Sequence, residues 1–440
     1  MDSLQRGPQL NLPLQGEDAC VPHSRTRPLV HVSRAIAVVA VLLCLGAADA
    51  STRRALSRAE IALRQKDYPE AHRNVDEAIA RAPLHAPAHV QLGILYLRQG
   101  ELHDAAASLT RATELDPESF SARYHLGLAR LRLGDLDTAH GAFSRAVRLA
   151  VQQKAEHPLA YYHLGMTLSR QQKYADAADA FRAAVDLDAD MPSPYYQWAN
   201  VELRRGNRED GRALLAKFRS VKAQKRIRQA ISRARQGNSD RALQLLERAL
   251  EMDREHPSAF HVLALLAFSE GRWDDAIRHA RRYVTLRPGA DDMQVILGAA
   301  LRRVGNAGAA MGALSNAIQG AADHPEARYE LGEAFLLADN AENAARSLKQ
   351  AGAKDPTFYQ AAYRLGTVLL DLDRPAEAAG VLRGAIAQYP QEQAPSDDML
   401  HGGNVPRLVR AALPAPTLEE CRSALSDALK RAAIQDGARP

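Results

Sequence analysis

Aromatic residues make up only 5% of the 440 residues, and the chain holds three cysteines, Cys20, Cys44 and Cys421. If a leader containing the first two were removed, Cys421 alone would remain and no internal disulfide could form. The sequence also contains no HExxH motif, no cysteine pair of the zinc-site kind, no G-x-S-x-G motif and no glycine-rich phosphate loop after a strand. These absences argue against an enzyme, and no cofactor or metal is expected.

Long hydrophobic runs are equally scarce. The apolar run 35–48 has about 14 residues, fewer than the roughly 20 that span a bilayer. Arg25, Arg27 and Arg34 precede it, and Ala48-Asp49-Ala50 offers small residues for cleavage. Residues 1–50 are therefore predicted to be a signal peptide that directs export to the periplasm or beyond. An uncleaved membrane anchor and a buried helix are the alternatives, and a cytoplasmic protein is the less favoured outcome.

Helix-forming residues are plentiful. The chain is rich in Ala, Leu and Arg, whereas β-branched residues are comparatively sparse, and 46% of the residues are hydrophobic. A single core rarely grows beyond about 250 to 300 residues, so this length predicts several domains or an elongated array. The composition favours an all-α protein whose helices pack through small residues. The net charge of +5 is small for this length and does not by itself point to nucleic acid.

One arrangement of residues recurs with a period near 34 residues. A Leu-Gly pair marks six copies, at Leu92-Gly93, Leu126-Gly127, Leu164-Gly165, Leu297-Gly298, Leu331-Gly332 and Leu365-Gly366. Four more copies carry alanine at the glycine position, at Ala59, Ala199, Ala230 and Ala264, so the chain contains ten repeat units. Twelve residues after each anchor comes another small residue, usually Ala, and four positions later there is generally an apolar residue.

This spacing predicts that each unit is a helical hairpin. The Leu-Gly and Ala-x-x-x-Phe patterns fall on single faces of two successive helices, and Gly or Ala at the crossing lets the backbones approach closely. Glycines such as Gly134 lie between the two halves, where a helix end favours a left-handed residue. Prolines such as Pro117 end the second helix.

The pattern resembles the tetratricopeptide repeat (TPR) over residues 52–390. The resemblance implies a right-handed superhelical solenoid in which the first helix of each hairpin lines a concave groove. It also implies a role in protein binding and no intrinsic catalysis. The spacing departs from the pattern at two junctions, near 150–157 and 219–226, where four residues are added and three are missing.

Two sets of residues are expected to face this groove. Tyrosines precede the anchors of five units and arginines follow the anchors of seven. The residues predicted to bind a partner are Tyr124, Tyr162, Tyr196, Tyr329 and Tyr363, and Arg98, Arg132, Arg170 and Arg204. Because arginine near a helix C-terminus also interacts favourably with the helix dipole, a purely structural role is the alternative. Tyrosine supplies rigid contact area and arginine pairs with carboxylates, so the predicted ligand is an acidic or C-terminal peptide of a partner protein.

Basic residues concentrate in the segment 204–241, with 13 Lys or Arg against 3 Asp or Glu. No Gly or Pro lies between Gly211 and Gly237, so a long helix across the shortened junction is one expectation. The charge would suit nucleic acid or anionic lipid, but the segment lacks the interleaved aromatic residues that stack on bases. A solvated helix face is the favoured interpretation.

After Pro390, residues 391–416 are predicted to be a linker and residues 417–435 a helix that covers the end of the last hairpin, beginning with a capping box of Thr417 and Glu420. The predicted function is that of a non-catalytic scaffold that binds a partner at a bacterial-type cell envelope. The alternatives are a regulatory subunit of an enzyme complex and a helical-repeat nucleic-acid binder that uses the basic segment. The sequence leaves the oligomeric state open.

Overall fold

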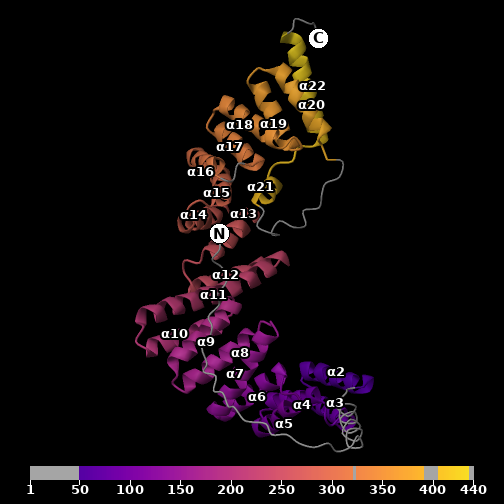
Figure 1. The fold of residues 1–440 in the computed structure, drawn as a ribbon. Helices are drawn as coiled ribbons and strands as arrows, with labels where there is room; N and C mark the ends of the chain where they lie inside the picture. Colours follow the sequence, from indigo (N-terminus) through magenta and orange to yellow (C-terminus); the bar gives the residue numbers. More distant parts are fainter. Residues whose placement is uncertain (1–48, 321–323, 391–404, 436–440) are drawn as a thin grey trace, which may run out of the picture. The chain divides into compact units, whose positions relative to one another are not determined.

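The computed structural model describes residues 49–320, 324–390 and 405–435, and every regular element within these ranges is an α-helix. The apolar run 35–48 lies outside the described residues. Figure 1 shows the helices coloured in the order of the sequence. The chain divides into two compact units, residues 1–155 and 156–440.

The first unit contains three helical hairpins. Its helices are α2 (Ala50–Gln65), α3 (Tyr68–Arg81), α4 (Ala86–Gln99), α5 (Leu102–Leu115), α6 (Phe120–Leu133) and α7 (Leu136–Gln152). The two helices of each hairpin pack along their length, and each second helix contacts the first helix of the next hairpin. The hairpins therefore stack in the order of the sequence.

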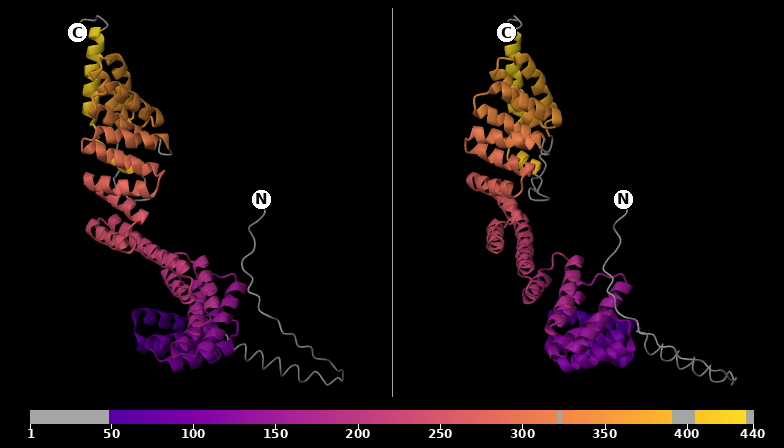
Figure 2. Two further views of the ribbon diagram at one scale, coloured as in Figure 1. Left: turned by 90° about the vertical axis from the view of Figure 1, so that its left-hand side faces the viewer. Right: turned by 60° about the vertical axis from the view of Figure 1, so that its left-hand side comes forward.

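The second unit stacks seven further hairpins. Their helices are α8 (Pro158–Arg170), α9 (Tyr174–Leu187), α10 (Pro192–Arg204), α11 (Arg208–Arg235), α12 (Ser239–Met252), α13 (Pro257–Ser269), α14 (Trp273–Leu286), α15 (Asp291–Arg303), α16 (Ala307–Gln319), α17 (Pro325–Leu337), α18 (Ala341–Lys354), α19 (Tyr359–Asp371) and α20 (Pro375–Ala387). Figure 2 shows the hairpins from α13 to α20 lying one upon the next. The predicted fold class, an all-α solenoid of helical hairpins, is confirmed.

Helix α11 belongs to two hairpins at once. It is 28 residues long, and it packs against both α10 and α12. No glycine or proline interrupts it between Gly211 and Gly237, so the backbone continues through the shortened junction without a break. The second helix of the fifth hairpin and the first helix of the sixth are thus one continuous helix.

Small residues let the helices of a hairpin cross closely. In the third hairpin, a Cβ atom on Gly127 would lie 2.7 Å from the Cε1 atom of Phe143, whose ring is fully buried. Helix α6 ends at Gly134 in the left-handed conformation, with φ of 83°. The carboxylate of Asp135 then caps α7 by accepting a hydrogen bond from the Thr138 backbone N–H at 3.2 Å. Residues close in the sequence therefore determine both the close crossing of α6 and α7 and the boundary between them.

The first helices form the concave side of each unit. Helix α2 contacts α4 and α4 contacts α6, while in the second unit α13 contacts α15 and α15 contacts α17. Successive second helices, such as α3 and α5 or α16 and α18, approach each other much less. A stack bends toward the side on which its helices lie closer together, so the first helices line the inside of the curve.

Two helices follow the tenth hairpin. Helix α22 (Leu418–Gln435) packs along α20 and covers the last hairpin, as predicted. The capping box also forms, since the Glu420 backbone N–H donates to Thr417 Oγ1 at 3.1 Å and the Thr417 N–H donates to Glu420 Oε2 at 2.6 Å. The segment 391–416, expected to be a linker, contains a helix that the sequence did not predict, α21 (Val405–Ala411), which contacts α15 and α17 (Figure 1).

Candidate partner-binding site

The first helices of the first unit carry an apolar floor. Val90 is buried on α4, and Ile94, Tyr124 and Leu128 are half-buried on α4 and α6. The Tyr124 ring lies edge-on to the Phe143 ring, with 6.0 Å between centroids, and burial raises the pKa of Tyr124 to about 12. Packing therefore fixes this tyrosine in its hairpin and leaves part of its ring for a ligand.

Two of the predicted arginines link neighbouring hairpins of this unit. The Arg98 guanidinium donates a hydrogen bond to the Leu63 carbonyl at 3.2 Å, and the Arg132 guanidinium donates to the Leu97 carbonyl at 3.0 Å. Each acceptor lies near the C-terminal end of the preceding first helix, where carbonyls lack partners within the helix. Both side chains nevertheless remain exposed. Arg98 and Arg132 thus have the structural role that the sequence offered as the alternative. Their exposed surface is also compatible with ligand binding.

The tyrosines at the start of the second unit differ in exposure. Tyr162 on α8 is half-buried, and its ring centroid lies 6.0 Å from that of Phe181. Tyr196 on α10 is 44% exposed and contacts Phe218 of α11 at 5.4 Å between centroids. Tyr196 therefore offers the largest free aromatic surface among the five predicted tyrosines.

The two predicted arginines of this region lie at helix ends. Arg204 donates a hydrogen bond to the Tyr174 hydroxyl at 3.4 Å, and its guanidinium carbon lies 5.9 Å from the centre of that ring. Arg170 is exposed at the last position of α8. Both retain solvent-facing surface for a ligand.

The last two predicted tyrosines are less accessible to a ligand than Tyr196. Tyr329 on α17 is only 3% exposed, packs against Phe358 with 5.5 Å between centroids, and has its pKa raised by burial. Tyr363 on α19 is half-buried and lines a hollow of about 610 Å³ that α22 closes on its other side. The expectation that Tyr329 faces an open groove is wrong, because the side chain is covered.

A segment of the chain itself covers the concave side at this point. Residues 405–413, which we call the strap, lie against α15 and α17. Val405, Leu408 and Val409 join the apolar core built from α13 to α17, and Leu413 joins the core that contains Tyr329 and Phe358. The strap thus occupies the concave groove of the eighth and ninth hairpins.

One arginine of the strap is held by two carboxylates. The Arg410 guanidinium donates to Glu326 Oε1 at 2.6 Å and to Asp355 Oδ2 at 2.7 Å, and its carbon lies 4.3 Å from the centre of the Phe358 ring. Burial pushes the pKa of both carboxyl groups upward. Hydrogen bonds from His324 to Glu326 and from Thr357 to Asp355, together with the hydrogen bonds and charge of Arg410, outweigh it. The pKa of Glu326 and that of Asp355 therefore lie below their ordinary values.

The positive charges of this groove are already paired. Arg302 donates to Glu330 Oε1 at 3.2 Å, and the Glu330 side chain is fully buried. Arg364 donates to Glu333 Oε1 at 2.6 Å. With its arginines bound to its own glutamates, this part of the concave side is unsuited to the acidic ligand expected from the sequence.

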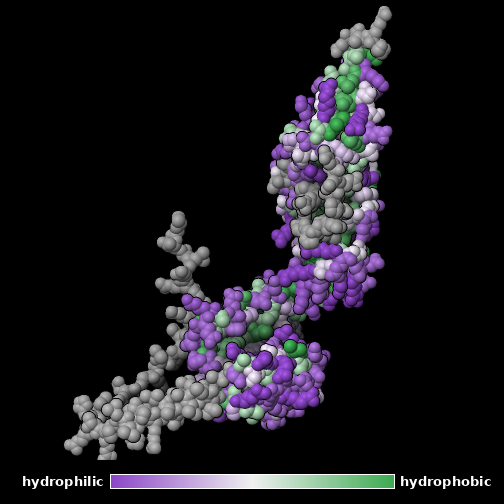
Figure 3. Space-filling view, turned by 90° about the vertical axis from the view of Figure 1, so that its right-hand side faces the viewer, coloured by the Kyte–Doolittle hydropathy of each residue, from purple (hydrophilic) through white to green (hydrophobic). Residues whose placement is uncertain are grey.

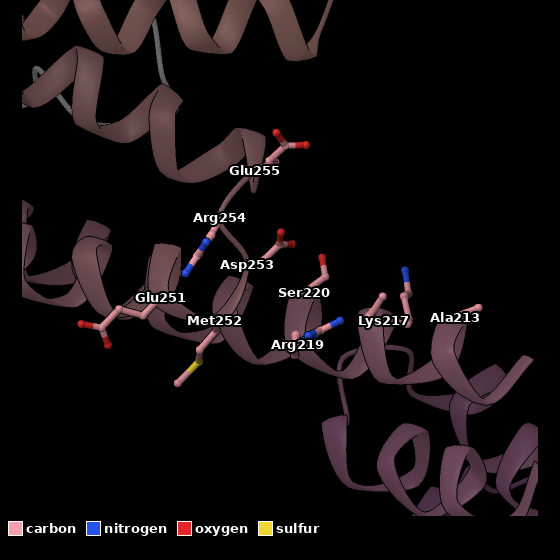
Figure 4. Close-up of a pocket in the computed structure, with 10 residues that line it drawn as sticks. Ala213, Lys217, Arg219, Ser220, Glu251, Met252, Asp253, Arg254 and Glu255 are labelled. Carbon is pink, nitrogen blue, oxygen red and sulfur yellow. The ribbon is translucent and has the colours of Figure 1, made fainter. Parts of the chain in front are cut away.

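The basic segment 204–241 contains the whole of α11. Beside the middle of this helix lies an open hollow of about 750 Å³, where Lys217, Arg219 and Arg254 meet Glu251 and Glu255 (Figure 4). Charges of both signs line the hollow, and the described residues contain no group of His, Cys, Asp or Glu side chains able to hold a metal. The mixed charge of the hollow does not favour a nucleic-acid surface.

Comparison with known families agrees with the hairpin geometry. One model of the tetratricopeptide repeat matches residues 56–119, 90–150, 124–192 and 227–291, and a second matches residues 335–396, which together cover more than half of the chain. The chain belongs to the tetratricopeptide repeat family. TPR arrays are scaffolds for protein–protein interaction, and this coarse function therefore applies to the chain.

Individual relatives are distant. The cytochrome c-type biogenesis protein CycH of Pseudomonas aeruginosa is 26% identical over 154 residues, which are 35% of this chain and 31% of CycH, so the chain spans about a third of the length of that relative. Among solved structures, MamA is 22% identical (38% of this chain, 95% of that chain, TM-score 0.36) and the pilus biogenesis factor PilW 17% (46% and 94%, 0.38). Yeast Tom70 is 15% identical (90% and 97%, 0.34). The three structural similarities, with TM-scores below 0.5, carry no functional information.

Sequence reasoning missed the strap and the carboxylates that hold it. The strap follows a segment rich in Gly and Pro, which is typical of a loop, and its helix has only seven residues. The available signal was the apolar spacing of Val405, Leu408 and Val409, which places three side chains on one helical face. Its partners are 55 to 109 residues away in the sequence, so local patterns could not identify them.

Proposed function

We propose that this TPR protein is a non-catalytic scaffold that binds a segment of a partner protein on the first helices α2, α4 and α6 of its first unit. The observation that carries the proposal is the combination of an apolar floor with two arginines, Arg98 and Arg132, that stay exposed although a backbone hydrogen bond orients each of them. A guanidinium has five N–H donors, so each keeps donors for a ligand. Pre-oriented arginines and aromatic rings are the groups that dominate interface energetics.

The proposed partner segment is acidic. Its carboxylates would accept hydrogen bonds from Arg98 and Arg132, while its apolar side chains would lie on the floor that includes Ile94 and Leu128. Aromatic and guanidinium groups of the same kind lie at the start of the second unit, and they form a second set of candidate contacts, namely Tyr162, Tyr196, Arg170 and Arg204. If the partner is an enzyme, the chain would serve as its regulatory subunit.

We also propose that the protein acts at the cell envelope, exported or anchored by its N-terminal segment. The apolar run 35–48, its preceding arginines and the small residues after it support this location. Among the residues that the structure describes, no helix is both long and apolar enough to cross a bilayer. The similarity to CycH supports cytochrome c-type biogenesis as the first process in which to look for the partner.

The test is capture of partners by the full chain, followed by cross-linking mass spectrometry and affinity measurement. Arg98→Ala and Arg132→Ala should each weaken the captured complex by about 1 to 3 kcal/mol, and added salt should weaken the wild-type complex more than either variant complex. Arg111→Ala is the matched control, because this exposed arginine lies on the second helix α5 and pairs only with Glu114 of its own helix.

Unchanged affinity in both groove variants would place the site elsewhere. Loss of helicity in the variants would show instead that the two arginines act only as links between hairpins.

A further inference from the structure

We propose that the groove over α15 and α17 is a second ligand site, distinct from the face of the first unit, and that the strap is its resident occupant. The ligand class is a short apolar helix that carries one arginine, supplied by a partner protein that displaces the strap. This inference does not depend on the function proposed for the first unit.

The strap has the features of a bound peptide ligand. Val405, Leu408 and Val409 are each at most 2% exposed, although a helix of seven residues is far below the roughly 12 to 15 at which isolated helices become even marginally stable. The groove therefore orders the strap. Its apolar side chains enter the core of the hairpins from the concave side, where a partner helix would also lie.

The groove recognises charge as well as apolar surface. Glu326 is 3% exposed. The Arg410 guanidinium donates hydrogen bonds to Glu326 and to Asp355, and it also lies over the Phe358 ring. His324 Nδ1 also lies 3.3 Å from Glu326 Oε2. Loss of the arginine would still take a permanent cation away from a nearly buried carboxylate, which is costly, so an occupant without a positive charge at this point would be disfavoured. The site consequently selects an arginine in its ligand and rejects an acidic residue there.

The groove also forms a hydrogen bond with the backbone of its occupant. Arg303 follows the anchor of its hairpin by five residues, as Arg98 and Arg132 do, and its guanidinium donates to the Ala412 carbonyl at 2.7 Å. In the first unit the same repeat position donates to a carbonyl of the preceding first helix. In the eighth hairpin the donor is thus directed to a carbonyl of the strap, a contact that any helix ending at this place can replace.

The chain connections let the strap leave without dismantling a hairpin. The strap is joined to α20 through residues 388–404 and to α22 through residues 414–417, and α22 packs directly on α20. The two ends of the connecting chain therefore stay anchored at the tenth hairpin when the strap is absent from the groove. Release of the strap exposes the groove of the eighth and ninth hairpins and preserves the cover of the last one.

The experiment uses a fluorescein-labelled peptide of residues 403–414 as the probe and full-length protein as the receptor. Leu408→Asp weakens the strap and leaves every groove residue unchanged, and Arg410→Ala is a milder second variant. We expect both variants to bind the peptide at least tenfold more tightly than the wild-type protein, in which the tethered strap competes. The same peptide carrying Arg410→Glu should lose at least tenfold in affinity for the Leu408→Asp protein.

Hydrogen exchange of α15, α17 and α19 accompanies the measurement. Equal affinity for wild-type protein and variants, or no binding to a variant whose three helices keep their protection, would overturn the proposal. Loss of protection in all three helices in both variants would overturn it as well, because the strap would then be an integral part of the core.

Discussion

At the scale of single residues, the TPR pattern has two kinds of physical cause. Position 127 requires glycine because the Phe143 ring occupies the space that a Cβ atom would take. Arg98 and Arg132 are explained by carbonyls in the last turns of first helices, to each of which an arginine of the next hairpin donates a hydrogen bond. Both causes act between nearest neighbours, which is why a period of one hairpin suffices to encode them.

Replacing Gly127 by alanine tests the crossing. The added methyl group would meet the fully buried Phe143 ring at 2.7 Å, so we expect Gly127→Ala to destabilise the third hairpin by about 1 to 3 kcal/mol. Gly141→Ala is the matched control, because nothing lies within 4 Å of a Cβ at this exposed position of α7. The control should stabilise α7 by about 0.5 to 1 kcal/mol. Urea denaturation of both variants measures the change in the free energy of unfolding. Equal changes of the same sign would contradict the predicted clash at Gly127.

At the scale of elements, the first helix shows how the leader joins the fold. The carboxylate of Asp49 caps α2 by accepting a hydrogen bond from the Thr52 backbone N–H at 2.7 Å. This bond and those from the Ser51 and Thr52 side chains lower the pKa of Asp49 to about 2. Cleavage after Ala50 would remove this cap, whereas cleavage after Ala48 would keep it.

We therefore predict that cleavage falls two residues before the boundary expected from the sequence, so that a processed chain begins at Asp49. Intact-mass measurement of protein from the envelope fraction should give the mass of residues 49–440, and Asp49→Ala should lower the melting temperature of the first unit. A mature chain that begins at Ser51 with an unchanged melting temperature would contradict the argument. Full-length protein in the membrane fraction would indicate an anchor, and full-length protein in the cytoplasm would exclude export.

The strap should also respond to pH. Because the pKa of Glu326 and that of Asp355 are lowered in the folded protein, their pairing with Arg410 contributes stability above the ordinary values of 4.5 and 3.8 and loses it as the pH falls through the folded values. Arg410→Ala should therefore weaken the docking of the strap on the eighth and ninth hairpins by about 1 to 3 kcal/mol at pH 7, since the pair is partly exposed, and by less at pH 3. Melting curves of both proteins at the two pH values measure the difference. A constant difference would mean that the carboxylates do not hold Arg410.

The elements also show how far a sequence can be interpreted. The hairpins, the continuous α11 and the capping helix follow from periodicity, from missing helix breakers and from Thr417 with Glu420, all of which act within a few residues. The burial of Tyr329 and the fold of the strap depend on contacts between distant segments, so local patterns cannot predict them. The sequence therefore predicts that the first helices form a groove. It does not predict that the strap fills the groove of the eighth and ninth hairpins.

At the scale of the whole molecule, the chain is a series of nearest-neighbour contacts within each unit. Most contacts between helices join a helix to the next one or to the next but one in the sequence. The strap is the main exception, because it ties α15 and α17 to the chain that follows α20. Figure 3 shows a strip of hydrophobic residues near the C-terminal end of the described chain. Leu429 and Ile434 of the capping helix are exposed.

Disturbing the capping helix should therefore have a local effect. Ala428 of α22 is fully buried in the core shared with α20, so Ala428→Asp would place an unpaired carboxylate there and detach the helix. Because stability in repeat arrays is close to a sum of local terms, hydrogen exchange should accelerate in α19, α20 and α22 and stay unchanged in α2 to α7. Leu429→Ser is the matched control, since this neighbouring side chain is 42% exposed and its replacement should leave exchange unaltered. Uniformly faster exchange along both units after Ala428→Asp would show that the array unfolds as a single cooperative body.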